Sequence, residues 1–90
     1  MNEELAKEVA EMITKKWNPE IPDLDSEDIY LGLIGKGVNV PEHDMNEILE
    51  TFKRAGLIGG PGYINDDAVR QHGAMTITSV NIGLLEQVQF

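Results

Sequence analysis

The chain contains no cysteine, so disulfide frameworks, thiolate metal sites and cysteine nucleophiles are excluded. It has no run of apolar residues approaching the length of a membrane span, and its first residues, Met1 to Glu4, are acidic rather than basic. The patterns of a transmembrane span and of a secretory signal are therefore both missing. We expect a cytoplasmic protein with no membrane partner.

Basic side chains are scarce. Seven Lys and Arg stand against 16 Asp and Glu in 90 residues, which makes the formal net charge −9. Because DNA and anionic membranes are bound through clustered Lys and Arg, this balance disfavours both as partners. The length suits one domain over residues 1–90, and a hydrophobic fraction of 41% is typical of a globular protein with one modest core.

The first segment, Asn2 to Trp17, has a helical period, and the dipeptide Asn18-Pro19 ends it because proline disfavours helical geometry at the preceding residue. Residues 19–24 contain two prolines and two acids and are predicted to form an extended connector. The apolar stripe of this first helix comprises Leu5, Val9, Met12, Ile13 and Trp17.

A second, short helix is predicted to begin at Asp25 or Ser26, since either side chain can accept hydrogen bonds from first-turn N–H groups. Gly32 suits close packing, and residues 35–37 suit a tight exit from the helix. The expected apolar face consists of Ile29, Tyr30, Leu33 and Ile34.

The third helix has the clearest pattern. Pro41 fits its first position, and Gly56 is predicted to end it in the left-handed conformation. Leu57-Ile58 then begins an extended segment. The apolar residues that recur at i, i+3, i+4 and i+7 are Met45, Ile48, Leu49, Phe52 and Ala55.

The last third of the chain alternates turns with extended residues. Residues 59–62 (Gly-Gly-Pro-Gly) predict a turn, Tyr63-Ile64 a strand, and residues 65–72 either a turn or one helical turn. Residues 74–78 have strand composition, with Met75 and Ile77 alternating against threonines. Thr78 or Ser79 is expected to cap a last helix, whose apolar positions are Val80, Leu84, Leu85 and Val88. The predicted fold class is α+β and mainly helical, with a short β-hairpin between Ile58 and Ile77.

The connection between the second and third helices is short, Gly35 to Val40, and contains one apolar residue, Val38. So short a connection forces the helices to cross steeply, as in a helix-turn-helix. Residues 38–41 and 48–58 resemble the winged helix-turn-helix superfamily, and residues 75–78 with 83–86 resemble the strand and closing helix of its small phage and bacterial members. The resemblance implies three N-terminal helices, a β-hairpin wing and a C-terminal helix. It also implies a third helix that enters the DNA major groove.

The charges on the third helix disfavour DNA binding. Four of the seven residues that the resemblance would expose are carboxylates, which repel phosphates. We therefore favour a non-catalytic protein-interaction module, with regulation among its roles, over a DNA-binding transcriptional regulator. A solvated face without any partner is the structural alternative, since acids also suit the start of a helix and Glu50–Arg54 has ion-pair spacing. The seven residues are Glu42, His43, Asp44, Asn46, Glu47, Glu50 and Thr51, and the predicted interaction face comprises Glu42, His43, Asn46, Glu47 and Glu50.

The alternative function, binding of nucleic acid, would depend on the cations near the turn, the end of the third helix and the following loop. These residues are Lys36, Lys53, Arg54 and Arg70.

No motif indicates catalysis, a cofactor or a small-molecule substrate. No Ser-His-Asp arrangement is legible, and the paired acids have no recognisable pocket to separate their pKa values. His43 beside Asp44 or Glu47 lacks a second His or Cys at metal-ligand spacing. We expect neither an enzyme nor a metal site.

The partner of the module is either another protein or a second copy of the chain. A homodimer could form through the first and last helices, whereas in the alternative reading the same residues cover the chain's own core. They are Leu5, Val9, Leu84, Leu85 and Val88.

Overall fold

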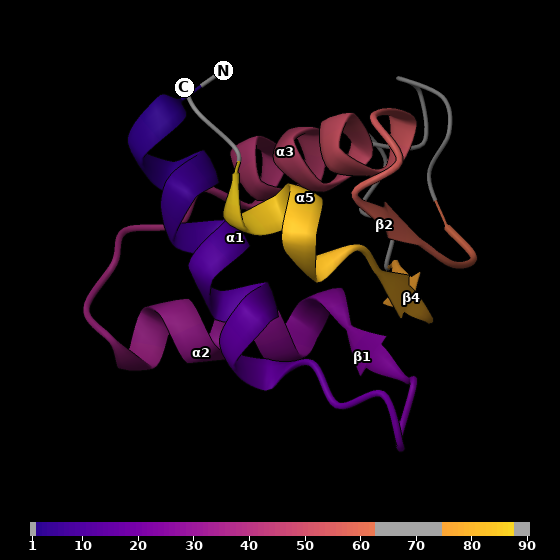
Figure 1. Ribbon diagram of the computed structural model, residues 1–90. Helices are drawn as coiled ribbons and strands as arrows, with labels where there is room; N and C mark the ends of the chain where they lie inside the picture. The colour runs from indigo at the N-terminus through magenta and orange to yellow at the C-terminus, as the bar shows by residue number, and fades with distance from the viewer. Residues whose placement is uncertain (1, 63–74, 88–90) are drawn as a thin grey trace.

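The computed structural model describes residues 2–62 and 75–87. This part of the chain is α+β and mainly helical, as predicted, and its short strands gather at one side of the helices (Figure 1). The helices are α1 (Glu3–Lys16), α2 (Ser26–Gly35), α3 (Glu42–Arg54) and α5 (Ile82–Glu86), and the strands are β1 (Leu24–Asp25), β2 (Ile58–Gly59), β3 (Thr76–Ile77) and β4 (Ser79–Val80).

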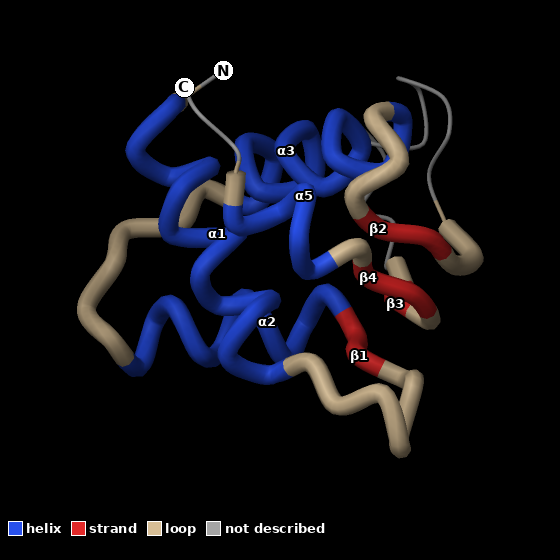
Figure 2. Tube along the Cα trace, viewed as in Figure 1, coloured by secondary structure: helices blue, strands red, loops and turns tan. Residues whose placement is uncertain are grey.

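The strands form two small antiparallel sheets that share one extended stretch. β3 pairs with β1, with Leu24 opposite Ile77, and β4 pairs with β2, with Ile58 opposite Val80. The Thr78 N–H donates to the Gly59 carbonyl at 2.8 Å, which continues the second pairing toward β3. Residues 76–80 therefore have hydrogen-bonded neighbours on both sides, one before α2 and one after α3 (Figure 2).

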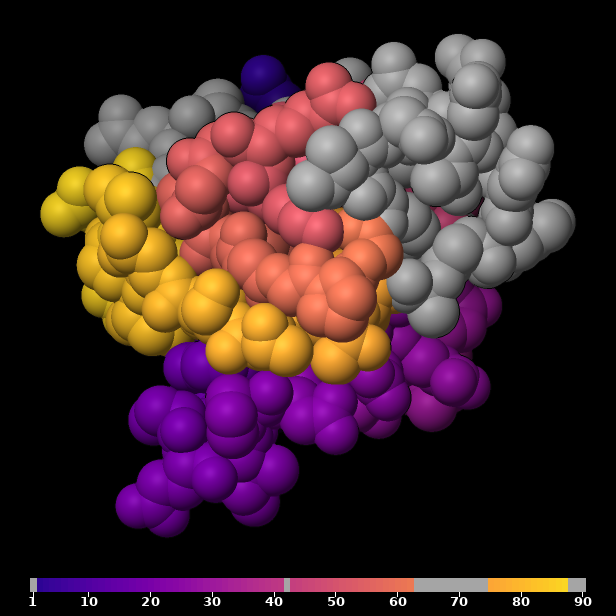
Figure 3. Space-filling view, turned by 90° about the vertical axis from the view of Figure 1, so that its right-hand side faces the viewer, coloured from indigo at the N-terminus to yellow at the C-terminus, as the bar shows by residue number. Residues whose placement is uncertain are grey.

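The first helix confirms its prediction. Asn2 caps it, because its Oδ1 accepts from the Leu5 N–H at 3.1 Å. Two acids in the first turn and Lys15 and Lys16 in the last turn complement the helix dipole. The connector that follows projects from the body of the molecule before the chain enters β1 (Figure 3). The prediction missed the strand at Leu24–Asp25 and assigned Leu24 to the connector.

The second helix begins at Ser26 with Asp25 as its N-cap residue, as predicted, but the predicted capping hydrogen bond to a side chain is absent. The carboxylate of Asp25 accepts from the Thr76 hydroxyl at 3.1 Å, and the Ser26 hydroxyl accepts from the Met75 N–H at 3.1 Å. Both side chains are therefore engaged by the distant strand segment rather than by the first turn of α2. The Ser26 N–H also donates to the Met75 carbonyl at 2.8 Å. Both backbone groups of Met75, its N–H and its carbonyl, are therefore hydrogen-bonded to Ser26 at the start of α2.

Glycine ends both middle helices in the same way. Gly37 follows α2 with φ 88° and Gly56 follows α3 with φ 77°, a backbone conformation that favours glycine. The Val38 N–H then donates to the Leu33 carbonyl, and the Leu57 N–H donates to the Phe52 carbonyl, each at 3.0 Å. These are Schellman-type terminations, and the predicted tight exit and left-handed end are both confirmed.

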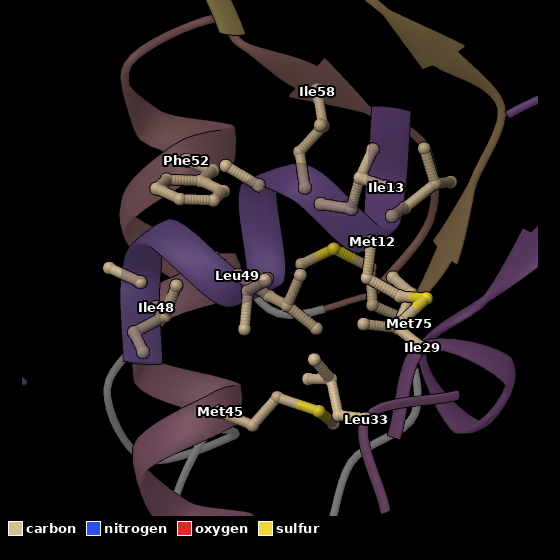
Figure 4. Close-up of a cluster of buried hydrophobic side chains, with 14 of the residues drawn as sticks. Met12, Ile13, Ile29, Leu33, Met45, Ile48, Leu49, Phe52, Ile58 and Met75 are labelled. Carbon is tan, nitrogen blue, oxygen red and sulfur yellow. The ribbon is translucent and has the colours of Figure 1, made fainter. Parts of the chain in front are cut away.

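The core lies where α1, α2 and α3 meet the strands (Figure 4). The stripes of α1 and α3 are buried as predicted, except that Trp17 is only partly buried and Ala55 is exposed. On α2, Ile29 and Leu33 are buried, Tyr30 is partly buried and Ile34 is exposed, so the predicted face is wrong for Ile34. The largest fully buried side chains are Phe52, Ile13, Ile29, Leu33, Ile48, Leu49, Met75, Ile77 and Val9.

The last helix begins later than predicted. Val80 continues the extended stretch in β4, and Asn81 caps α5 by accepting from the Leu84 N–H at 3.1 Å. The extended stretch also runs beyond the predicted strand end at Thr78, because residues 79–80 pair with β2. The predicted hairpin between Ile58 and Ile77 is wrong in its pairing, since Ile58 lies opposite Val80 and Ile77 lies opposite Leu24. The predictions for residues 63–74 and for Val88 lie outside the described residues.

None of the helices within residues 2–62 and 75–87 is long and apolar enough to span a membrane.

Candidate functional site

The predicted interaction face of α3 divides into exposed and buried residues. His43 and Glu47 are exposed, and His43 Nε2 lies 3.7 Å from Glu47 Oε2. Asn46 and Glu50 are only 3% and 4% exposed, so the expectation that they point outward is wrong. Glu42 is the first residue of α3, and its side chain lies outside the described part of the structure. Of the other two residues placed on this face, Asp44 is half-buried and Thr51 is exposed.

Glu50 is buried and is paired with an exposed cation. Its Oε1 accepts from Arg54 Nε at 2.9 Å, one turn further along α3. The spacing Glu50–Arg54 matches the predicted i,i+4 pair, but the carboxylate is shielded while the guanidinium is half-exposed. A buried carboxylate is tolerated when it is paired and hydrogen-bonded. Asn46, Glu50 and Lys53 lie on the flank of the apolar stripe, and the buried arc of α3 is wider than that stripe.

The candidate DNA-contacting cations are held by the chain itself. Lys36 Nζ lies 2.9 Å from Glu8 Oε2 on α1, and the hydrogen bond and the charge of Glu8 raise the pKa of Lys36. Lys53 Nζ donates to the Gly62 carbonyl at 2.6 Å, and Arg54 is bound to Glu50. Arg70 lies outside the described residues. Each of the three described cations therefore already has a partner within the chain.

The connection between α2 and α3 is well packed. Val38, the lone apolar residue of the α2–α3 connection, is partly buried against the core, and Val40 is buried. Gly32 allows α2 to approach α1 closely, since a Cβ built there would lie 2.7 Å from Lys16 Cε and 2.9 Å from Met12 Sδ. The predicted close packing at Gly32 is confirmed. These contacts fix how α3 is presented relative to α1 and α2.

The residues proposed for a homodimer lie mainly in the chain's own core. Leu5, Val9 and Leu85 are buried where α1 packs against α3 and α5, which confirms the alternative reading for these three. Leu84 is exposed, and Val88 lies outside the described residues. An open cleft remains between α1 and α5, with charged residues from both helices at its rim. Its lining comprises Lys7, Ala10, Glu11, Thr14, Lys15, Leu85 and Glu86.

One exposed apolar surface was missed from the sequence. Leu31 and Ile34 point away from the core on α2, whereas Ile29 and Leu33 fill the core. The sequence did contain a sign of this surface, because residues 29–34 are apolar around the whole helix apart from Gly32. Only one side of a surface helix can be buried, so some of these apolar residues had to be exposed.

No cluster of three or more His, Asp or Glu that could hold a metal ion occurs within residues 2–62 and 75–87. No protein-family model, no curated protein and no solved structure matches this chain. The function is therefore inferred from the geometry and charges of α2, α3 and the strands.

Proposed function

We propose that this chain is a small acidic winged-helix domain that acts as a non-catalytic protein-interaction module. The fold assignment is supported by the order of elements: three helices with a strand between the first two, then antiparallel strands and a closing helix. It is further supported by the stretch 76–80, which pairs with a strand before α2 and with a strand after α3. The short α2–α3 connection plugged by Val38 suits a helix-turn-helix.

The functional proposal depends on one observation, that the described cations near α3 are already bound within the chain. Lys36, Lys53 and Arg54 are each bound to a carboxylate or carbonyl of the same chain. The exposed part of α3 instead presents Glu47 beside His43. Proteins gain affinity for DNA when Lys and Arg replace the counterions of the phosphates, and the exposed part of α3 supplies few such cations. Its Glu47 carboxylate can instead pair with Lys or Arg on a basic protein surface.

DNA binding is the second candidate function, because the side chains of Lys36 and Arg54 are half-exposed despite their ion pairs. Exposed pairs contribute little stability, so phosphates could displace Glu8 from Lys36 at small cost. In this alternative the contacts would come from Lys53 and Arg54 in the last turn of α3 and from Lys36 directly after α2.

A duplex titration separates the two functions. With a fluorescein-labelled duplex of about 20 base pairs in ~0.1 M salt, we expect any binding to be weaker than about 100 µM, the weak end of non-specific DNA binding. Micromolar binding that falls steeply with added salt, and that the double variant Lys53→Glu, Arg54→Glu abolishes, would establish the DNA-binding alternative instead.

A second titration tests the interaction face directly. A flexible peptide of alternating Lys and Gly should shift the backbone amide signals of His43 and Glu47 in an NMR spectrum. Glu47→Lys should remove those shifts, whereas Glu20→Lys, the same charge reversal on the exposed connector, should leave them unchanged. Equal loss in both variants would mean that only the net charge attracts the peptide, and α3 would not be the interaction face.

A further inference from the structure

The exposed apolar residues of α2 form one continuous patch. Leu31 is 57% exposed and Ile34 is 45% exposed, and residues three apart on a helix are neighbours on one face. The other two large exposed hydrophobic residues of the described part, Ile21 and Leu84, belong to the connector and to α5. Single exposed apolar residues are ordinary on protein surfaces, but a pair on one helix face is a local feature that a partner can cover.

Acidic residues continue this patch toward the start of α2. Glu27 lies one turn before Leu31 and two turns before Ile34, and Asp28 lies three residues before Leu31. Both acids are exposed. No Lys, Arg or His occurs from Trp17 to Gly35, a stretch that holds five carboxylates.

The nearest cation along the chain does not neutralise these acids. Lys36 follows α2 directly, but its ammonium group is bound to Glu8 of α1 at 2.9 Å. Lys16 of α1 also lies against α2, at Gly32, but no ion pair joins it to Glu27 or Asp28 in the described part of the chain. The exposed face of α2 therefore combines an apolar end with a negative end.

We propose that the face formed by Glu27, Asp28, Leu31 and Ile34 docks a basic amphipathic helix of a partner protein. An amphipathic helix places apolar side chains at i, i+3 and i+4, which can cover Leu31 and Ile34. Lys or Arg on the same helix can pair with Glu27 and Asp28, which gives the complex charge complementarity.

A second copy of this chain fits the face less well. It would bring another Glu27 and Asp28 to the interface, and each chain carries a formal net charge of −9. Like charges across an interface are repulsive, so the charge pattern favours a basic partner over self-association. The inference uses a different face from the α3 surface of the proposed function and does not depend on it.

The test uses the full chain and a synthetic peptide of about 18 residues, long enough to form a helix, with Leu at helical spacing and Lys elsewhere. We expect a dissociation constant on the order of 10 µM by fluorescence anisotropy. The amide shifts should centre on residues 27–34. Leu31→Ser with Ile34→Ser should weaken binding by about tenfold or more, and Glu27→Gln with Asp28→Asn should reduce its dependence on salt.

Two controls make the result specific. Leu84→Ser removes an equally exposed leucine from α5 and should leave the affinity unchanged. A scrambled peptide of the same composition should bind at least about tenfold more weakly, because it lacks an apolar face. All substituted residues are exposed, so circular dichroism should report an unchanged fold for every variant.

Several outcomes would overturn the inference. These are no binding of the Leu/Lys peptide, equal binding of the scrambled peptide, equal loss in Leu84→Ser, or amide shifts outside α2. A dimer of the chain alone that Leu31→Ser dissociates would assign the face to a second copy instead. The Lys-Gly peptide and the α3 shifts report separately on the proposed function, so either idea can fail while the other stands.

Discussion

The ammonium group of Lys36 lies 2.9 Å from Glu8 Oε2 and connects the turn after α2 to α1, 28 residues earlier in the chain. The hydrogen bond to Glu8 and the charge of Glu8 raise the pKa of Lys36 above its ordinary value of 10.5, and Glu11 adds to this effect. The pair lies at the surface, where water and salt screen it. It nevertheless engages a cation that the DNA-binding alternative requires.

Glu8→Gln should therefore lower the pKa of Lys36 toward its ordinary value. Because the pKa is raised in the folded state, the stabilisation from this pair is present below about pH 10.5 and is lost as the pH rises through the folded-state pKa. The variant and the parent should then converge in thermal stability at strongly alkaline pH. NMR titration of the lysine side chains measures the pKa, with Glu20→Gln as the control. An unchanged pKa of Lys36 in Glu8→Gln would contradict the pairing.

Gly60→Ala should destabilise the protein by at least about 2 kcal/mol, since overpacking and a strained backbone each cost ~1–3 kcal/mol. Gly60 has φ 137°, and a Cβ there would collide with the backbone of Thr76 and Thr78. Gly35→Ala is the control: beyond its chain neighbours and its own helix backbone, no atom lies within 4 Å of the added Cβ, so this change should not destabilise the protein. Urea unfolding measures both, and equal effects would contradict the close approach at Gly60.

Ser26→Ala should cost about 1–3 kcal/mol, because the buried Met75 N–H loses the hydroxyl that accepts its hydrogen bond. The exposed Ser79 provides the comparison, and Ser79→Ala should change the free energy of unfolding by no more than ~0.5 kcal/mol. Hydrogen exchange at Met75 should also accelerate in Ser26→Ala. If exchange there is unaffected, the hydroxyl does not hold this strand.

Phe52→Ala should cost about 3–5 kcal/mol, a large part of the stability of a small domain. The side chain is fully buried where α3 faces α1, and its removal leaves a cavity (Figure 4). Leu84→Ala, on the exposed side of α5, should cost less than ~1 kcal/mol. Similar losses for the two variants would show that Phe52 does not anchor the core.

The helices were more predictable than the strands. α1 and α3 have long amphipathic periods, so their positions and most of their buried residues follow from spacing alone. β1 has only two residues, Leu24 and Asp25, and exists because it pairs with β3, which lies about 50 residues later. Val80 has helical spacing to Leu84, but pairing with Ile58 holds it in a strand. Neither pairing leaves a local pattern in the sequence.

The candidate site was predicted only in part. His43 and Glu47 lie on the surface as expected, whereas Asn46 and Glu50 are buried on the flank of the apolar stripe. Leu31 was overlooked because residues 29–34 are apolar around most of the helix, and periodicity does not show which side of such a helix will face solvent.

The amino-acid pattern alone defined the two long helices, the glycine terminations after α2 and α3, and the acidic surface, because each depends on residues within a turn or two of one another. Tertiary contacts decided the rest. They directed Asp25 and Ser26 to the strand instead of the helix cap, paired Lys36 with Glu8, and left Leu31 and Ile34 exposed. These choices depend on groups distant in the chain, whose proximity arises only when the core forms.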